Sequence, residues 1–236
     1  MDFSDPISTV VPSVRGRVLL VIGRSGLELT GRRIAELAET SAERTRQILG
    51  DMMQSGLVRS RRAGQAILYE ANRDHLLWPA VQRLVEDSDQ AVWALKQRVA
   101  GALVKTIGAD AAKGTTAALF GSVARGDSRP GSDVDVLLIT PDDLDESRAE
   151  DVVVSVIREV ESATGNDCNV FHVTRARFDA LARENDPMIA SWSSDAAIFN
   201  GPDFRRRLKG ARWDELAKPP RAGSANGPPR PASTFK

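Results

Sequence analysis

Apolar residues recur at spacings of three and four in three successive segments near the N-terminus, which predicts three helices. The first spans residues 14–23 and ends on glycine, and the second spans residues 29–39 with Thr30 placed as its N-cap. The third begins after Ser41, a natural N-cap, and Gly56 stands just past its end, where glycine commonly closes a helix.

Two short strand-like runs follow, on either side of a turn at residues 63–65, which predicts a β-hairpin. The order of three helices and a hairpin over residues 14–74 resembles a winged helix-turn-helix domain. The resemblance implies that the third helix enters the major groove of duplex DNA and that the hairpin wing touches its backbone. The residues placed for these contacts are Arg44, Arg46 and Gln47 on the helix and Arg59, Arg61 and Arg62 on the wing.

The local charge agrees with a DNA-binding module. Residues 14–73 hold eleven arginines against six acidic residues, a net charge of +5. Arginine pairs with guanine edges and with phosphate oxygens, so it suits both contacts. Two other interpretations stay open: the arginines keep an exposed face soluble, or the fold is a protein–protein module.

The rest of the chain predicts one long helical connection and then a mixed sheet. Residues 75–107 are helical in pattern, with Pro79 expected to divide them into two segments. The later strands are expected at 115–120, 134–140 and 169–174, and the later helices at 149–165, 175–184 and 187–199. The tail, residues 217–236, is rich in Pro, Gly and Ser and is expected to be disordered.

Two carboxylates stand at the start of one predicted strand. Asp133 and Asp135 are two residues apart, so their side chains share a face with Cα atoms about 6.6 Å apart. Such a pair can chelate a hard divalent cation such as Mg²⁺, which relieves the repulsion between the two charges. Upstream, Gly121 allows close approach of the backbone to a phosphate, and Ser122 begins a helical turn with free N–H groups and a hydroxyl. Arg125 can pair with a carboxylate or reach a phosphate.

Residues 121–139, with Gly-Ser, Arg-Gly and Ser-Asp-x-Asp ahead of an apolar strand, resemble the signature of the polymerase-β-like nucleotidyltransferases in their minimal branch. The resemblance covers about residues 103–201. It implies a mixed α/β fold whose Asp133 and Asp135 hold Mg²⁺ while an NTP, expected to be ATP, gives its NMP to an acceptor hydroxyl. The nucleotide-binding residues that it implies are Gly121, Ser122, Arg125 and Ser132.

One position departs from that family. Its active members carry a third carboxylate on a later strand, and here Asn169 takes that place, with Asp167 two residues earlier on the same face. An amide cannot deprotonate an acceptor and is a weaker metal ligand than a carboxylate. Asp167 and Asn169 therefore complete the candidate catalytic set, and Asp167 could substitute by a small register shift.

The composition of the chain indicates the class of protein and the compartment in which we expect it. The chain has 236 residues, 42% hydrophobic and 27% charged, which is typical of a globular protein. Its apolar runs fall short of the roughly 20 residues of a membrane span, the acidic N-terminus is unlike a signal peptide, and a single cysteine, Cys168, is typical of a reducing cytoplasm. The formal net charge of zero hides a segment, residues 133–186, with five arginines against fourteen acidic residues, a net charge of −9.

The sequence thus predicts a two-domain chain, α+β followed by α/β, in the cytoplasm. Its expected parts are a winged helix-turn-helix at 14–74, a connecting helix at 75–106, a nucleotidyltransferase-like domain at 107–216 and the tail at 217–236.

Two functions of different classes stay open. In the first, the chain is an enzyme that nucleotidylates a protein or a small molecule, with the DNA-binding domain as regulator. In the second, it is a transcriptional regulator whose second domain is a weak or inactive nucleotide sensor. The Gly-Ser and Asp-x-Asp set favours the enzyme, slightly, and Asn169 favours the sensor. The partners expected are duplex DNA, a nucleotide and a protein acceptor, with a homodimer also compatible and no membrane.

Overall fold

The computed structural model describes residues 1–216, which fold into two compact units. The helical unit is residues 5–91, and the sheet unit is residues 1–4 together with the described chain from residue 92 onward. The tail that we predicted to be disordered lies outside the described residues. No helix in the described part has both the length and the apolar character that crossing a membrane requires.

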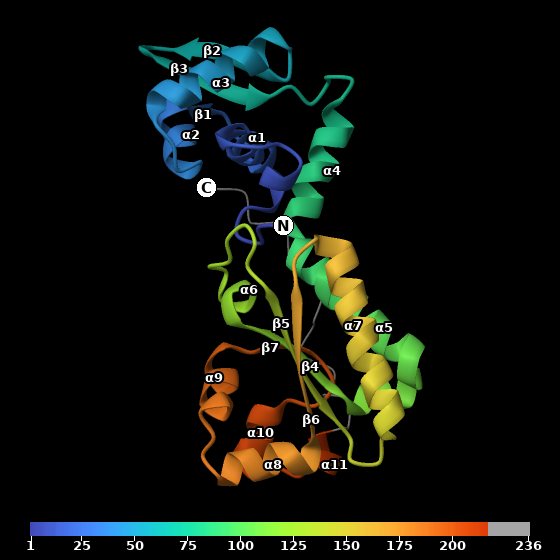
Figure 1. Cartoon of the computed structure of the whole chain (residues 1–236). Helices are drawn as coiled ribbons and strands as arrows, with labels where there is room; N and C mark the ends of the chain where they lie inside the picture. The colour runs from blue at the N-terminus through green and yellow to red at the C-terminus, as the bar shows by residue number, and fades with distance from the viewer. Residues whose placement is uncertain (217–236) are drawn as a thin grey trace. The chain divides into compact units, whose positions relative to one another are not determined.

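The helical unit follows the predicted order of three helices and a hairpin (Figure 1). Both predicted caps form, because the hydroxyl of Thr30 accepts from the backbone N–H of Arg33 and that of Ser41 from Arg44, each at 3.2 Å. The hairpin turns between Ala63 and Ala66, as predicted. The elements are η1 (Pro6–Thr9), α1 (Val14–Arg24), β1 (Leu29–Thr30), α2 (Gly31–Leu37), α3 (Ala42–Gln54), β2 (Val58–Ala63), β3 (Ala66–Ala71) and α4 (Trp78–Asp89).

The helical unit has its own core and a small antiparallel sheet of order β1-β3-β2. Val18 and Ile22 of α1 pack with Ile34 of α2 and with Ile48 and Leu49 of α3, and all five are at most 2% exposed. The apolar stripes that predicted the three helices are therefore the surfaces by which they pack together.

The long helical connection breaks at a different place from the one that the sequence suggested. Pro79 lies in the first turn of α4, where the missing N–H breaks no helical hydrogen bond. The break falls instead at Gln90, after which α5 (Ala91–Gly114) begins, with a kink at Gly108. Proline marks the start of a helix here, not its interruption.

The sheet unit is built on four strands in the order β6-β5-β4-β7. β5 runs parallel to β6 and antiparallel to β4, and β7 adds antiparallel to the other side of β4. Its elements after α5 are β4 (Thr116–Phe120), α6 (Gly121–Arg125), β5 (Val134–Thr140), α7 (Glu146–Thr164), β6 (Cys168–Thr174), α8 (Arg175–Arg183), α9 (Pro187–Asp195), β7 (Ala197–Asn200), α10 (Phe204–Leu208) and α11 (Trp213–Leu216).

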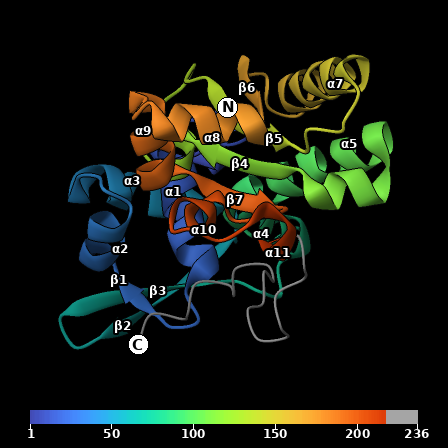
Figure 2. The ribbon, with the colours of Figure 1, turned by 90° about the horizontal axis from the view of Figure 1, so that it is seen from below.

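Helices cover both faces of this sheet (Figures 1 and 2). α5 and α7 pack on one face, where Leu103 and Val156 meet Val136 and Leu138 of β5. α8, α9 and α10 pack on the other face, in a cluster that holds Leu137, Ile139, Phe178, Trp192 and Phe204. Because both faces are covered, β5 reads as a nearly continuous apolar run, interrupted only by Asp135.

The predicted helix at 187–199 ends earlier than expected. α9 stops at Asp195, and residues 197–200 form strand β7 instead. β4 is fully buried, and without β7 the backbone groups on that edge of β4 would be left unpaired. The segment Ala-Ile-Phe-Asn therefore gains more from pairing with β4 than from one further helical turn. The end of α9 lies beside α6, where Asp195 pairs with Arg125.

Candidate functional site

The polar side chains near the beginnings of β5 and β6 meet on one face of the sheet. The parallel register sets Asp135 opposite Asn169, and Asp133 lies just before β5. The amide nitrogen Nδ2 of Asn169 is 3.2 Å from Oδ2 of Asp133 and 3.2 Å from Oδ1 of Asp135. The structure thus brings together three of the residues that the sequence analysis singled out, two carboxylates bridged by one amide.

Asp135 lies in surroundings that disfavour its charge. Partial burial raises the pKa of Asp135 above the ordinary aspartate value, and the neighbouring charge of Asp133 raises it further. The hydrogen bond from Asn169 and the charge of Arg125 only partly oppose this rise in pKa. A bound cation at this position would relieve both the burial cost and the repulsion.

Position 121 requires glycine because of its contact with Asp135. Strand β4 ends at Phe120, which pairs with Asp135, and Gly121 then turns into α6 with a φ of +68°. A Cβ atom on Gly121 would stand 2.3 Å from Oδ2 of Asp135. The sequence interpretation assigned this glycine to close approach of a phosphate, and that role stays a prediction. The structure adds a second reason for glycine, because Oδ2 of Asp135 lies beside the place that a Cβ would take.

Arg125 and Ser132 both have partners within the protein. Arg125 is exposed and forms ion pairs with Asp195 at the end of α9, at 2.7 Å, and with Asp127, at 3.3 Å. Of the two roles foreseen for Arg125, this structure has the carboxylate pairing. The hydroxyl oxygen of Ser132 accepts the backbone N–H of Arg129 at 2.8 Å, which closes the turn ahead of Asp133.

Asp167 stands at the entrance to β6, where its carbonyl oxygen accepts the N–H of Val134 at 2.9 Å. Its side chain is exposed. Within residues 1–216, no group of three or more His, Cys, Asp and Glu side chains is arranged to hold a metal ion. The third polar group at the Asp133–Asp135 pair is therefore the amide of Asn169 and not a carboxylate.

The donor set nevertheless fits a hard divalent cation. Two carboxylates and one amide oxygen are all ligands that Mg²⁺ accepts, and the remaining positions suit water and phosphate oxygens. Asn169 now points its nitrogen at both carboxylates, and a rotation of the amide by about 180° would point the oxygen there instead. The residues that would hold Mg²⁺ are thus Asp133 and Asp135, with Asn169 as a weaker third ligand.

A strap formed by residues 1–4 holds the loop that carries Asp133, and nothing in the local sequence pattern indicates it. Asn166 is buried; its Nδ2 donates to the carbonyls of Met1 and Ser132, at 2.9 and 2.8 Å, and its Oδ1 accepts from the nitrogen of Met1 at 2.6 Å. Phe3 is inserted into the core beneath α5 and α7. These contacts join residues far apart in the chain, so only the fold reveals them.

We expect Asn166→Ala to destabilise the sheet unit by about 1–3 kcal/mol, because it leaves two partly buried backbone carbonyls without this donor. Urea unfolding followed by tryptophan fluorescence measures the loss. Asn166→Asp keeps the acceptor oxygen and the size but loses the two donated bonds, so it should be destabilised as well. An unchanged urea midpoint for both variants would contradict the bridging role of this amide.

The six candidate DNA-contacting residues of the helical unit are all exposed, and most have acidic or polar partners on that unit. Arg46 pairs with Glu43 at 2.5 Å, and the Nε of Arg61 donates to Glu28 at 2.6 Å. Arg44 donates to Gln47 at 3.2 Å. Exposed pairs of this kind contribute little to stability, so a phosphate can displace them.

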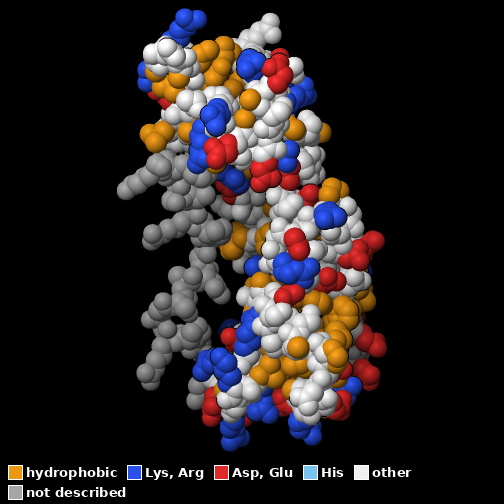
Figure 3. Space-filling view, turned by 90° about the vertical axis from the view of Figure 1, so that its left-hand side faces the viewer, with side chains coloured by type: hydrophobic (Ala, Val, Ile, Leu, Met, Phe, Trp, Pro, Cys, Tyr) orange, Lys and Arg blue, Asp and Glu red, His pale blue; other side chains and the backbone are white. Residues whose placement is uncertain are grey.

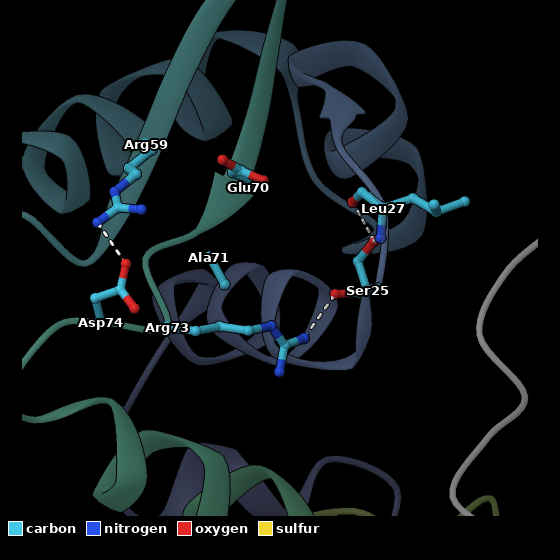
Figure 4. Close-up of a pocket in the computed structure, with 8 residues that line it drawn as sticks. Ser25, Leu27, Arg59, Glu70, Ala71, Arg73 and Asp74 are labelled. Carbon is cyan, nitrogen blue, oxygen red and sulfur yellow. Dashed lines mark hydrogen bonds and ion pairs between the residues drawn. The ribbon is translucent and has the colours of Figure 1, made fainter.

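The base of the hairpin is tied to the loop after α1 (Figure 4). Arg59 pairs with Asp74 at 2.9 Å, and Arg73 donates to the carbonyl of Ser25 at 3.2 Å, around a cavity of about 200 Å³. Among the described residues, the side chain of Arg62 has neither an ion pair nor a hydrogen bond, which leaves it available to a partner. On the face seen in Figure 3, basic and acidic side chains are interspersed and do not form one continuous basic patch.

The fold and the site together define a mixed α/β domain with an Asp-x-Asp pair behind a Gly-Ser turn. Residues 103–186 match the family model of the nucleotidyltransferase domain. That stretch contains the paired aspartates, Gly121, Ser122 and Asn169, and it supports a nucleotidyltransferase domain in this part of the chain. No curated protein and no solved structure gives a significant match to the chain.

Proposed function

We propose that the chain is a Mg²⁺-dependent nucleotidyltransferase that moves an NMP group from an NTP to the hydroxyl of a protein or a small molecule. The observation that carries this proposal is the convergence of Asp133, Asp135 and Asn169 next to Gly121, within the stretch that matches the nucleotidyltransferase domain. Mg²⁺ bound there supplies charge neutralisation for the transferred phosphate.

In the proposed reaction, the acceptor oxygen bonds to the α-phosphorus, the bond from that phosphorus to the bridging oxygen breaks, and pyrophosphate leaves. The protein positions the triphosphate through the turn at Gly121 and Ser122. The proton of the acceptor hydroxyl needs a base, and Asn169 cannot take it. The nearest carboxylate along this segment of the chain is that of Asp167, just before β6. It lies two residues before Asn169 and, by strand alternation, on the same face of the sheet.

Incubation with ATP labelled at the α-phosphate, Mg²⁺ and a lysate of the source cells tests the enzyme. Transfer of the label to a protein or a small molecule supports the proposal, and Asp135→Asn provides the matched background. Removal of Mg²⁺ with EDTA should abolish the transfer. Equal labelling by the wild type and Asp135→Asn would count against it.

A second candidate is favoured by Asn169 alone: a regulator that binds an NTP–Mg²⁺ complex without transferring the nucleotide. The amide bridges the two aspartates in the place where a base would be expected. Calorimetric titration together with a pyrophosphate assay in the lysate distinguishes the candidates, because both bind the nucleotide and only the enzyme releases pyrophosphate.

Asn169→Asp should raise transfer activity by about 10²-fold or more, because a carboxylate supplies general-base catalysis that an amide cannot. Asp167→Asn is the matched variant, and it should abolish wild-type activity if Asp167 already acts as the base. Initial rates of pyrophosphate release measure both. A protein that is inactive as wild type and also as Asn169→Asp would favour the sensor.

The helical unit is proposed as a winged helix-turn-helix that binds duplex DNA, with α3 in the major groove and the β2–β3 hairpin as the wing. Its support is the order of elements, the exposed arginines at α3 and on the hairpin, and the net charge of +5 over residues 14–73. DNA binding would bring the nucleotidyltransferase domain to a promoter or regulate it there.

We expect Arg62→Ala to weaken binding to all DNA sequences and to reduce the slope of log K against log salt by about 1, because Arg62 is free to contact a phosphate. Glu28→Gln should strengthen binding, since it releases Arg61 from its ion pair. Fluorescence anisotropy with a short random-sequence duplex measures both effects on the full chain. Absence of any binding by the wild type at low salt would rule out the DNA-binding role.

A further inference from the structure

A cavity of about 600 Å³ opens beside the C-terminal ends of β5 and β6 and the first turns of α7. Thr140, His172 and Thr174 line it from the strands. These residues alternate onto the sheet face opposite the one that carries Asp135 and Asn169. The cavity is therefore separate from the candidate nucleotide site, and its volume lies within the range of small-molecule sites.

The walls of the cavity are mainly apolar. Leu144, Ala149, Val153 and Val154 line it alongside the strand residues, and Val154 is 53% exposed although it is a large apolar side chain. Burial of an exposed apolar surface of this kind favours a ligand with an apolar body.

One side of the cavity is acidic and lacks a compensating cation. Glu146 and Glu150 stand four residues apart on α7, so they are neighbours on the helix surface. Neither forms an ion pair within residues 1–216, and no lysine or arginine is among the residues that line the cavity. The helix dipole stabilises Glu146 in the first turn, but Glu150 is a full turn further along.

The polar groups at the strand side also leave the acidic charge uncompensated. Oγ1 of Thr140 is hydrogen-bonded to Nε2 of His172 at 2.9 Å. Burial lowers the pKa of His172 below its ordinary value, so the imidazole is neutral near pH 7. The nearby Arg148 donates instead to the carbonyl of Ile107, at 2.8 Å, on α5.

We propose that this cavity binds a small organic cation, an ammonium group carried on a short apolar body. The ammonium group lies between Glu146 and Glu150, where it removes the repulsion between them. The apolar body lies against Val153 and Val154. The site is independent of the proposed transferase chemistry, since it is on the other face of the sheet.

Isothermal titration of the full chain with benzylamine tests the proposal, with benzyl alcohol and benzoate as neutral and anionic probes of similar size. We expect saturable binding of benzylamine that weakens with added salt, weaker binding of benzyl alcohol, and none of benzoate. Glu146→Gln and Glu150→Gln should each weaken benzylamine binding by about fivefold, as loss of a partly exposed ion pair implies. Val153→Trp should fill the cavity and abolish binding.

Asp135→Asn is the matched control on the opposite face, and it should bind benzylamine as the wild type does. The two glutamine variants change exposed side chains and should fold normally, so they decide the case even if Val153→Trp does not fold. Benzyl alcohol binding as tightly as benzylamine, unchanged binding in both glutamine variants, or no saturable benzylamine binding would each overturn the proposal.

Discussion

Asp133→Asn and Asp135→Asn should each lower Mg²⁺-dependent nucleotide binding by at least about 100-fold. Loss of a residue that only supports a metal ligand already costs about 10- to 100-fold, and these two carboxylates are the proposed ligands themselves. Each variant leaves one carboxylate beside Asn169, which is too few strong ligands for a cation that remains largely hydrated. Calorimetric titration with a non-hydrolysable ATP analogue and Mg²⁺ measures the loss.

Asp135→Asn should increase the stability of the protein at neutral pH, although it lowers nucleotide binding. Folding raises the pKa of the Asp135 carboxyl. Such a carboxyl stabilises the folded state when the pH is below its ordinary pKa of about 3.9, and this stabilisation is lost as the pH rises through the higher pKa of the folded state. Asp135→Asn removes this pH-dependent loss of stability. The difference between the Tm of the variant and that of the wild type should therefore increase from acidic to neutral pH. Thermal melts at several pH values, without Mg²⁺, check it. A Tm of Asp135→Asn below that of the wild type at neutral pH would contradict the account of Asp135. Unchanged nucleotide affinity in both Asp133→Asn and Asp135→Asn would contradict the assignment of the metal site.

The sequence predicted the local parts of the molecule well because local signals determine them. The N-caps Thr30 and Ser41 and the hairpin at 63–66 depend on neighbouring residues only, and they formed as predicted. The convergence of Asp133 and Asp135 on one face followed from strand alternation. The helix expected over residues 197–199 was wrong because a short apolar segment has no decisive period, and the pairing of β7 with β4 is a property of the whole sheet.

The parts of the site that sequence reasoning missed are held by long-range contacts. The bridge from Asn166 to Met1 and Ser132, and the ion pair of Arg125 with Asp195, join segments with no relation in sequence spacing. Asn169 was recognised by position, but its hydrogen bonds to both aspartates needed the register of β6 against β5. The contact of Gly121 with Asp135 was missed for the same reason, because the two residues are neighbours only in the folded sheet.

Gly121→Ala should both destabilise the sheet unit and disrupt the metal site. The positive φ of +68° costs a residue with a Cβ about 1–2 kcal/mol. The new methyl group would also stand 2.3 Å from Oδ2 of Asp135, and relief of that overlap by displacement costs about 1–3 kcal/mol more. Displacement of Asp135 moves its carboxylate away from Asp133 and Asn169, so we expect Mg²⁺-dependent nucleotide binding to fall together with the free energy of unfolding.

Gly126→Ala separates the two causes. Gly126 closes the other end of α6 with a φ of +78°, but a Cβ there meets nothing within 4 Å. Gly126→Ala should therefore lose only the free energy that a positive φ costs a residue with a Cβ. The double variant Gly121→Ala with Asp135→Ala should recover most of the difference between the two glycine variants, because the overlapping carboxylate is gone. Urea unfolding of the wild type, these three variants and the single variant Asp135→Ala measures this coupling. Equal losses for Gly121→Ala and Gly126→Ala would show that contact with Asp135 does not require glycine at position 121.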